Sequence, residues 1–255
     1  MASFPAVLQS EWTKIRSVRS TIWTLALTFL ITLVVGGLLS LVTKLNFEEF
    51  TEGSSTPFDA TGTAFSGILL GELAIIVFGV LAVGNEYSSG MIRVSLAAVP
   101  QRATLLLGKA AVLGALALAV SLATAFITFF TGQAILGSHS TTIGSDNVLR
   151  AVIGAALYLT MLCLFAAGVT AMLHNQTLAL GVLVPFFFLL SPILSAVPYA
   201  KNVARYFPDY AGSRMLTVYE QSGQPYGPWA GFFICLAWTV AAIAGGILVL
   251  KKRDA

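Results

Sequence analysis

Six apolar stretches of about 20 residues or more constrain this chain more than any other feature of its sequence. A helix rises about 1.5 Å per residue, so each stretch is long enough to cross the roughly 30 Å hydrocarbon core of a bilayer. Only 10% of the residues are charged, whereas soluble domains typically have about 25%. The sequence therefore predicts an all-α integral membrane protein with one transmembrane domain over residues 1–255. We expect its spans at about residues 21–43, 64–83, 104–134, 149–173, 177–197 and 230–250.

The segment before the first span, residues 1–20, is predicted to form an interfacial helix. Its apolar side chains recur at helical spacing, at Phe4, Val7, Leu8, Trp12 and Ile15. Trp12 with the neighbouring basic residues suits a helix in the headgroup region. The alternative is a soluble amphipathic turn that only leads into the membrane. Glu11 among the bases, and the long apolar run that follows, argue against a cleavable signal peptide.

The distribution of basic residues predicts that both termini are cytoplasmic. With that orientation nine of the 14 Lys and Arg residues lie inside and five outside, and cytoplasmic loops carry an excess of Lys and Arg. The inner set is Lys14, Arg16, Arg19, Arg93, Arg102, Lys109, Lys251, Lys252 and Arg253. This also accounts for the net charge of +3 without a nucleic-acid partner.

The second span contains a charge, Glu72, and a pair of small residues, Gly67 and Gly71. A charged side chain at the bilayer centre costs about 2.5–3.5 kcal/mol on insertion scales, so we expect Glu72 to face protein or water. Two interpretations stay open: a polar contact for a transported substrate, or a structural hydrogen bond to a neighbouring helix. The glycines, four residues apart, predict a close approach of another helix.

A polar segment, residues 84–101, separates the second and third spans. We expect a sharp exit at Gly84, a short helix opened by Glu86 and Tyr87, and a stop at Pro100. Met91, Ile92, Ser95 and Leu96 fall at helical spacing and predict a small exposed apolar face. Such a face needs the membrane surface or a groove in a partner to pack against.

The sequence contains no catalytic or nucleotide-binding motif that we can identify. Its nearest approach to a phosphate-binding loop, at residues 108–110, lacks both the first glycine and the hydroxyl residue of that motif. His139 and His174 are isolated, and no serine lies in a G-x-S-x-G motif. We therefore expect a chain that is not an enzyme and that binds no metal or cofactor of its own. Lys109, near the inner end of the third span, is expected to extend to the membrane surface.

Residues 86–93, EYSSGMIR, resemble the signature E-Y-x-x-G-(M/T)-(I/L)-R of the permease subunits of type-2 ABC (ATP-binding cassette) transporters. These are six-span membrane subunits whose first cytoplasmic loop is a coupling helix, seated in a groove of the ATPase subunit. Two further stretches are similar to that family. Residues 10–23, SEWTKIRSVRSTIW, resemble its lead-in helix, and residues 206–212, YFPDYAG, resemble the outer re-entrant hairpin before its last span.

The resemblance implies the permease subunit of an ATP-driven exporter in a bacterial plasma membrane. ATP and Mg would be bound by separate ATPase subunits, and a second permease chain, identical or not, would pair with this one in the lipid bilayer. The implied ATPase-coupling residues are Glu86, Tyr87, Gly90, Met91, Ile92 and Arg93. Glu72 is a departure from this pattern, and its place in a substrate pathway is an interpretation of its charge inside a span, not an implication of the resemblance. The rival hypotheses are an ion-coupled secondary transporter with Glu72 as proton site, and a non-transporting membrane immunity or scaffold protein.

Overall fold

The computed structural model describes residues 3–17, 19–52, 57–219 and 224–252, so Arg253 lies outside it. Its helical elements are, in chain order, α1 (Phe4–Ser17), α2 (Arg19–Leu45), α3 (Phe47–Thr51), α4 (Ala60–Ala64), the 3-10 turn η1 (Phe65–Gly67), α5 (Ile68–Ser88), α6 (Met91–Ala98), α7 (Arg102–Leu136), the 3-10 turn η2 (Gly137–His139), α8 (Val148–Leu173), α9 (Gln176–Pro185), the π-helical turn η3 (Phe186–Leu190), α10 (Ser191–Ala196), α11 (Lys201–Ala204), α12 (Pro208–Ser213), the 3-10 turn η4 (Arg214–Leu216) and α13 (Pro228–Lys252).

Six stretches of helix among the described residues are long and apolar enough to cross a membrane. They are Ser20–Leu45, Ala60–Ser88, Arg102–His139, Val148–Leu173, Gln176–Ala196 and Pro228–Lys252. The described residues contain no strand. The predicted fold class, an all-α membrane protein with six spans, is confirmed.

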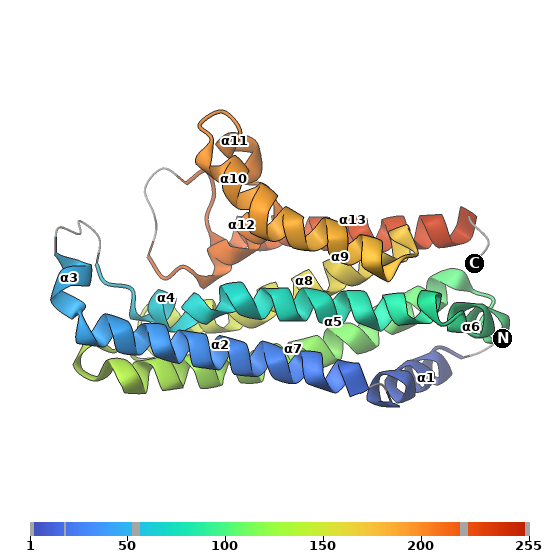
Figure 1. The fold of residues 1–255 in the computed structure, drawn as a ribbon, viewed down its shortest axis with the longest axis horizontal. Helices are drawn as coiled ribbons and strands as arrows, with labels where there is room; N and C mark the ends of the chain where they lie inside the picture. The colour runs from blue at the N-terminus through green and yellow to red at the C-terminus, as the bar shows by residue number, and fades with distance from the viewer. Residues whose placement is uncertain (1–2, 18, 53–56, 220–223, 253–255) are drawn as a thin grey trace.

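The spans run up and down, so α6 and the ends of α1 and α13 lie at one end of the bundle and α3 at the other (Figure 1). We call the first of these the α6 end. α8 is central and packs against α5, α7 and α13. Of its most apolar stretch, 78% is buried, against 22% for Gln176–Ala196. The many alanines on α8 let neighbouring helices approach it closely.

Gly67 and Gly71 lie where the second span meets α2. A Cβ atom added at Gly67 would be 2.2 Å from the carbonyl oxygen of Thr32, and one added at Gly71 would be 2.0 Å from the Thr32 hydroxyl oxygen. Both distances are far shorter than a van der Waals contact, so a side chain at either position would push the helices apart. The small residues thus bring α2 and the second span into backbone contact.

The fifth span is interrupted in its middle. α9 ends at Pro185, the turn η3 is π-helical, and α10 follows with Pro192 in its first turn. A proline removes one backbone donor and crowds the preceding turn, so the regular hydrogen-bond ladder cannot continue through it.

Between the fifth and sixth spans the chain forms α11, α12 and η4. α12 packs back on α13 and contacts α8, and a Cβ atom added at Gly212 would be 2.3 Å from Cδ2 of Tyr158. The YFPDYAG stretch therefore folds against the bundle, and it brings Asp209 next to the spans.

Candidate functional site

The polar segment after the second span differs in one respect from the prediction. Glu86 and Tyr87 do not open a short helix; they lie in the last turn of α5, which continues to Ser88. The helix breaks at Gly90, whose φ of 71° is in the left-handed region that glycine adopts readily. α6 begins directly after it, at Met91. Nothing between Gly84 and Ser88 stops a helix, so the expected exit at Gly84 was wrong.

α6 turns a different face outward from the one expected. Ile92 and Ser95 are 6% and 8% exposed, whereas Met91 and Val94 are 38% and 69% exposed. Ile92 packs in a small core with Val7, Val99 and Leu105, which come from α1 and from around the start of α7. Helical spacing predicted which residues of α6 share one face. It did not predict which face α1 would cover. The outward surface of α6, which we call the α6 face, consists of Met91, Arg93, Val94, Ala97 and Ala98.

Behind this face lies a buried cluster of four charges, Glu11, Lys14, Glu86 and Lys109, which we call the ion cluster. Lys14 Nζ lies 2.6 Å from Glu11 Oε1 and 2.8 Å from Glu86 Oε1. Lys109 Nζ lies 2.9 Å from the same oxygen of Glu86 and also pairs with Glu11 Oε2. Lys14 also donates a hydrogen bond of 2.9 Å to the hydroxyl of Ser95 in α6. The ion cluster therefore joins α1, α5, α6 and α7.

Three of the four charges in the ion cluster are closed to solvent, and the Lys14 side chain is 24% exposed. Glu11, Glu86 and Lys109 are 0%, 3% and 4% exposed. Buried charges are tolerated when they are paired and hydrogen-bonded, and here two acids balance two bases. Burial lowers the pKa of Lys14, but the hydrogen bonds and charges of Glu11 and Glu86 outweigh it, so the pKa is raised above its ordinary value.

Sequence reasoning missed this cluster. Lys109 does not extend to the surface as expected, because two carboxylates hold it inside. One signal was present: Glu11 is four residues from both Val7 and Ile15, and these three residues form the buried stripe of α1. An acid in the middle of an apolar stripe predicts a buried basic partner.

Two more contacts hold the α6 end together. The ring of Tyr87 lies 4.7 Å from the ring of His174, measured between centroids, which links the end of α5 to the end of α8. Arg102 donates a hydrogen bond of 2.5 Å to the carbonyl of Leu250, which links the start of α7 to the end of α13. Arg93, by contrast, is exposed.

Glu72 is buried inside the bundle, with 5% of its surface exposed. The hydroxyl of Tyr158 in α8 donates a hydrogen bond of 2.6 Å to its Oε2 atom. Glu72 also lines a cavity of about 220 Å³, together with Ser191 and Asp209. The hydrogen bond to a neighbouring helix, one of the two interpretations of Glu72, is present, and contact with a substrate stays a prediction. Asp209 was missed because the sequence placed it in an outer loop.

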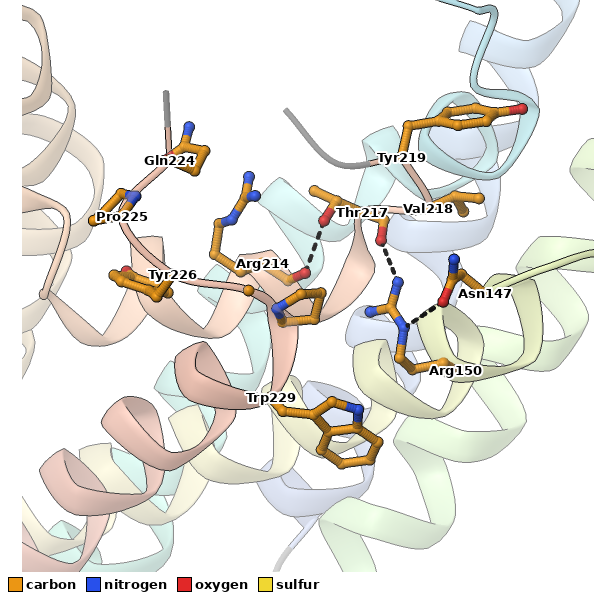
Figure 2. A pocket seen from close by; sticks show the side chains of 12 residues that line it. Asn147, Arg150, Arg214, Thr217, Val218, Tyr219, Gln224, Pro225, Tyr226 and Trp229 are labelled. Atoms are coloured by element: carbon orange, nitrogen blue, oxygen red, sulfur yellow. Dashed lines mark hydrogen bonds between the residues drawn. The ribbon is translucent and has the colours of Figure 1, made fainter. Parts of the chain in front are cut away.

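A second cavity, of about 370 Å³, is lined by residues at the start of α8, in and after η4 and at the start of α13 (Figure 2). Arg150 of α8 crosses it and donates hydrogen bonds to Asn147, to the carbonyl of Met215 and to the carbonyl of Thr217. Arg214 and the ring of Trp229 also line this cavity. These bonds attach η4 and the chain after it to α8.

Within the described residues, no group of three or more His, Cys, Asp or Glu side chains could hold a metal ion. Cys163 and Cys235 are both buried and form no disulfide.

Six long apolar helices, with the buried α8 at their centre, define a multi-pass membrane protein. The family model described as "ABC-2 family transporter protein" matches residues 7–196, and the chain belongs to this family. The match covers most of α1, the first five spans and the α6 segment. It identifies the chain as a permease domain of an ABC transporter, a membrane subunit of a transporter. No curated protein sequence matches the chain.

Proposed function

We propose that this chain is the permease subunit of an ATP-driven ABC exporter, and that a separate ATPase subunit docks on the α6 face. The observation that carries the proposal is the pairing of this exposed face with the ion cluster directly behind it. The ATPase would bind ATP and Mg, and this chain would bind neither.

The α6 face suits a protein partner. It combines exposed apolar side chains, Met91 and Val94, with one exposed positive charge, Arg93. α6 is eight residues long, or about 12 Å, so it fits a groove rather than a flat interface. In this proposal Met91, Arg93 and Val94 contact the ATPase, whereas Ile92 and Gly90 shape α6 from behind.

The ion cluster supplies a path from α6 into the membrane. Ser95 of α6 is bonded to Lys14, and Lys14 is bonded to Glu86 at the end of the second span. Lys109 extends the same connections into the third span. Closely packed, ion-paired elements move together, so a displacement of α6 by the ATPase would also move α1, α5 and α7.

The α6 end would face the cytoplasm of a bacterium, and a second permease chain would pair with this one in the lipid bilayer. The basic residues of the α6 end, among them Arg93, Arg102 and Lys251, support this orientation. Membership of the ABC-2 family supports an ABC ATPase as the general kind of partner.

The test is purification of the tagged chain from its native membrane in mild detergent, followed by mass spectrometry and an ATP hydrolysis assay. We expect a stoichiometric ABC ATPase with the wild type. Arg93→Glu should lose it, and the matched control Lys201→Glu, an exposed charge reversal at the other end of the bundle, should retain it. Absence of any ATPase, under conditions that preserve other membrane complexes, would contradict the proposal and favour an ion-coupled transporter that uses Glu72.

Neighbouring positions on α6 give a sharper version of this test. A cysteine at Val94, which is 69% exposed, should form a crosslink to the captured ATPase. A cysteine at Ile92, which is 6% exposed, should not. Equal crosslinking at both positions would contradict docking on the α6 face. Capture of an ATPase without any ATP-dependent transport would favour a scaffold or immunity protein.

A further inference from the structure

The cavity beside Glu72 is formed by residues from four different parts of the chain. Leu69 and Glu72 come from α5, Tyr158 from α8, and Ser191 and Asp209 from the fifth span and α12. Its volume is about 220 Å³, room for a small organic group. Glu72 is near the middle of the span Ala60–Ser88, so the cavity lies well inside the membrane region.

Two carboxylates from different elements line this cavity. Glu72 accepts one hydrogen bond, from Tyr158, and Asp209 accepts one through Oδ2, from the hydroxyl of Ser191. The other oxygen of Asp209, Oδ1, is buried without a well-formed hydrogen bond, and the backbone N–H groups of Tyr210 and Asp209 face the carboxylate. Burial raises the pKa of Asp209, because its negative charge has lost water without gaining a positive partner.

No basic residue in the part of the chain that the structure describes supplies that partner. The described residues that line the cavity include no Lys, Arg or His, and neither Glu72 nor Asp209 forms an ion pair within the described part of the chain. The other buried acids, Glu11 and Glu86, each contact two lysines. The cavity in Figure 2 has the opposite character, because Arg150 and Arg214 line it.

The rest of the wall indicates which kind of cation fits. Leu69, Phe187 and the ring of Tyr158 give the cavity apolar and aromatic sides. Aromatic faces and carboxylates together recognise ammonium groups. A metal ion would need more ligands, and no set of three suitable side chains is present among the described residues.

We propose that this cavity binds an organic cation, an ammonium group that carries a small apolar body, as the transported substrate or as part of it. Glu72 and Asp209 supply the negative charge, and Tyr158 and Ser191 hold the two carboxylates in place. The inference rests on the proposed transport function, because a binding site within the membrane region serves a substrate that crosses it. A charged residue inside a span is costly, and a cationic substrate gives it a role.

The test is equilibrium binding to the purified full chain in nanodiscs of phosphatidylcholine at pH 8. The probe is radiolabelled benzyltrimethylammonium, competed by the unlabelled compound or by its uncharged isostere neopentylbenzene, in which carbon replaces nitrogen. We expect saturable binding of one probe per chain, competition by the cation, and no competition by the neutral isostere. Absence of binding, or equal competition by both compounds, would overturn the proposal.

Variants assign the binding to this cavity. Glu72→Gln and Asp209→Asn keep the side-chain shape and should each weaken binding by about tenfold or more. Ser195→Trp should block the cavity without changing a charge. Glu48→Gln, an exposed acid on α3, is the matched control and should bind like the wild type. Melting curves show which variants are folded, and the same affinity in the folded cavity variants as in the wild type would show adventitious binding and overturn the proposal.

This experiment needs no ATPase, so its outcome is separate from that of the proposed function. Capture of an ATPase without cation binding would reject only the substrate assignment. Cation binding in a chain that captures no ATPase would reject only the proposed coupling.

Discussion

Lys109 in α7 and Glu86 in the last turn of α5 form a buried ion pair, with Nζ and Oε1 2.9 Å apart. Glu86 is two residues before the end of α5 and four before Gly90, where the chain turns into α6. The pair therefore joins the second and third spans close to α6, the exposed helix that we propose as the docking element.

Replacing Lys109 with Met should lower the free energy of unfolding by about 3–5 kcal/mol, because it leaves buried carboxylates with one positive partner instead of two. Thermal unfolding in detergent measures this. Lys44→Met, at the exposed end of α2, is the control and should melt at the same temperature as the wild type.

The double variant Lys109→Met with Glu86→Gln should lose less stability than the sum of the two single changes, because the second change removes the acid that has lost its partner. Strictly additive effects would show that the two side chains act independently.

Lys14 should make stability fall at high pH. Its pKa in the folded chain is above the ordinary value of 10.5, because Glu11 and Glu86 outweigh burial. A raised pKa gives a stabilisation that is complete below the unfolded value and is lost as the pH rises through the folded value. The melting temperature should therefore drop above about pH 10.5.

The variant Lys14→Arg isolates this effect, because arginine stays protonated in that range. Above pH 10.5 the melting temperature of this variant should change less with pH than the melting temperature of the wild type does. Lys44→Arg should leave the alkaline drop unchanged. The same drop in Lys14→Arg as in the wild type would rule out Lys14 as its source.

Gly90 should be sensitive to backbone strain and insensitive to side-chain volume. Its φ is 71°, and an added Cβ atom would meet nothing within 4 Å. Gly90→Ala should therefore cost about 1–2 kcal/mol from the left-handed conformation alone, and Gly90→Asn should cost less. Gly90→Pro cannot adopt a positive φ, so it should displace α6 and abolish capture of the ATPase while the chain still inserts. Hydrogen exchange of the α6 amides measures the first two changes. Equal protection of these amides in the wild type, Gly90→Ala and Gly90→Asn would contradict a left-handed conformation at Gly90.

Gly71 and Gly67 should differ in whether a second change rescues them. An alanine at either should cost about 1–3 kcal/mol through overpacking against α2. The Gly71 clash is with the hydroxyl oxygen of Thr32, so Thr32→Ala should restore much of the stability of Gly71→Ala. The Gly67 clash is with the backbone carbonyl of the same residue, so Thr32→Ala should not rescue Gly67→Ala. Thermal unfolding of the two double variants decides this, and Gly181→Ala, with open space around it, is the control.

Local features of the sequence predicted a short helix that ends before Pro100, but they placed its start at Glu86. In the structure Glu86 belongs to α5, and α6 begins at Met91, after Gly90. Which side of α6 is buried depends on α1, which packs there through Val7. The same limit applies to Glu72: its cost in a membrane was evident from the sequence, whereas Asp209, 137 positions further along the chain, reaches it only because α12 folds back on the spans.

The sequence by itself determined the class of fold, because the length and polarity of each apolar run are local properties that dictate a membrane helix. It also determined the family, through the match over residues 7–196. The tertiary structure alone decided the partners of the buried charges. Lys109 and Glu11 are 98 residues apart and meet because α1 packs against the start of α7. A charge in an apolar environment must find an opposite charge or stay uncompensated, and only the packing of the helices determines which of these occurs.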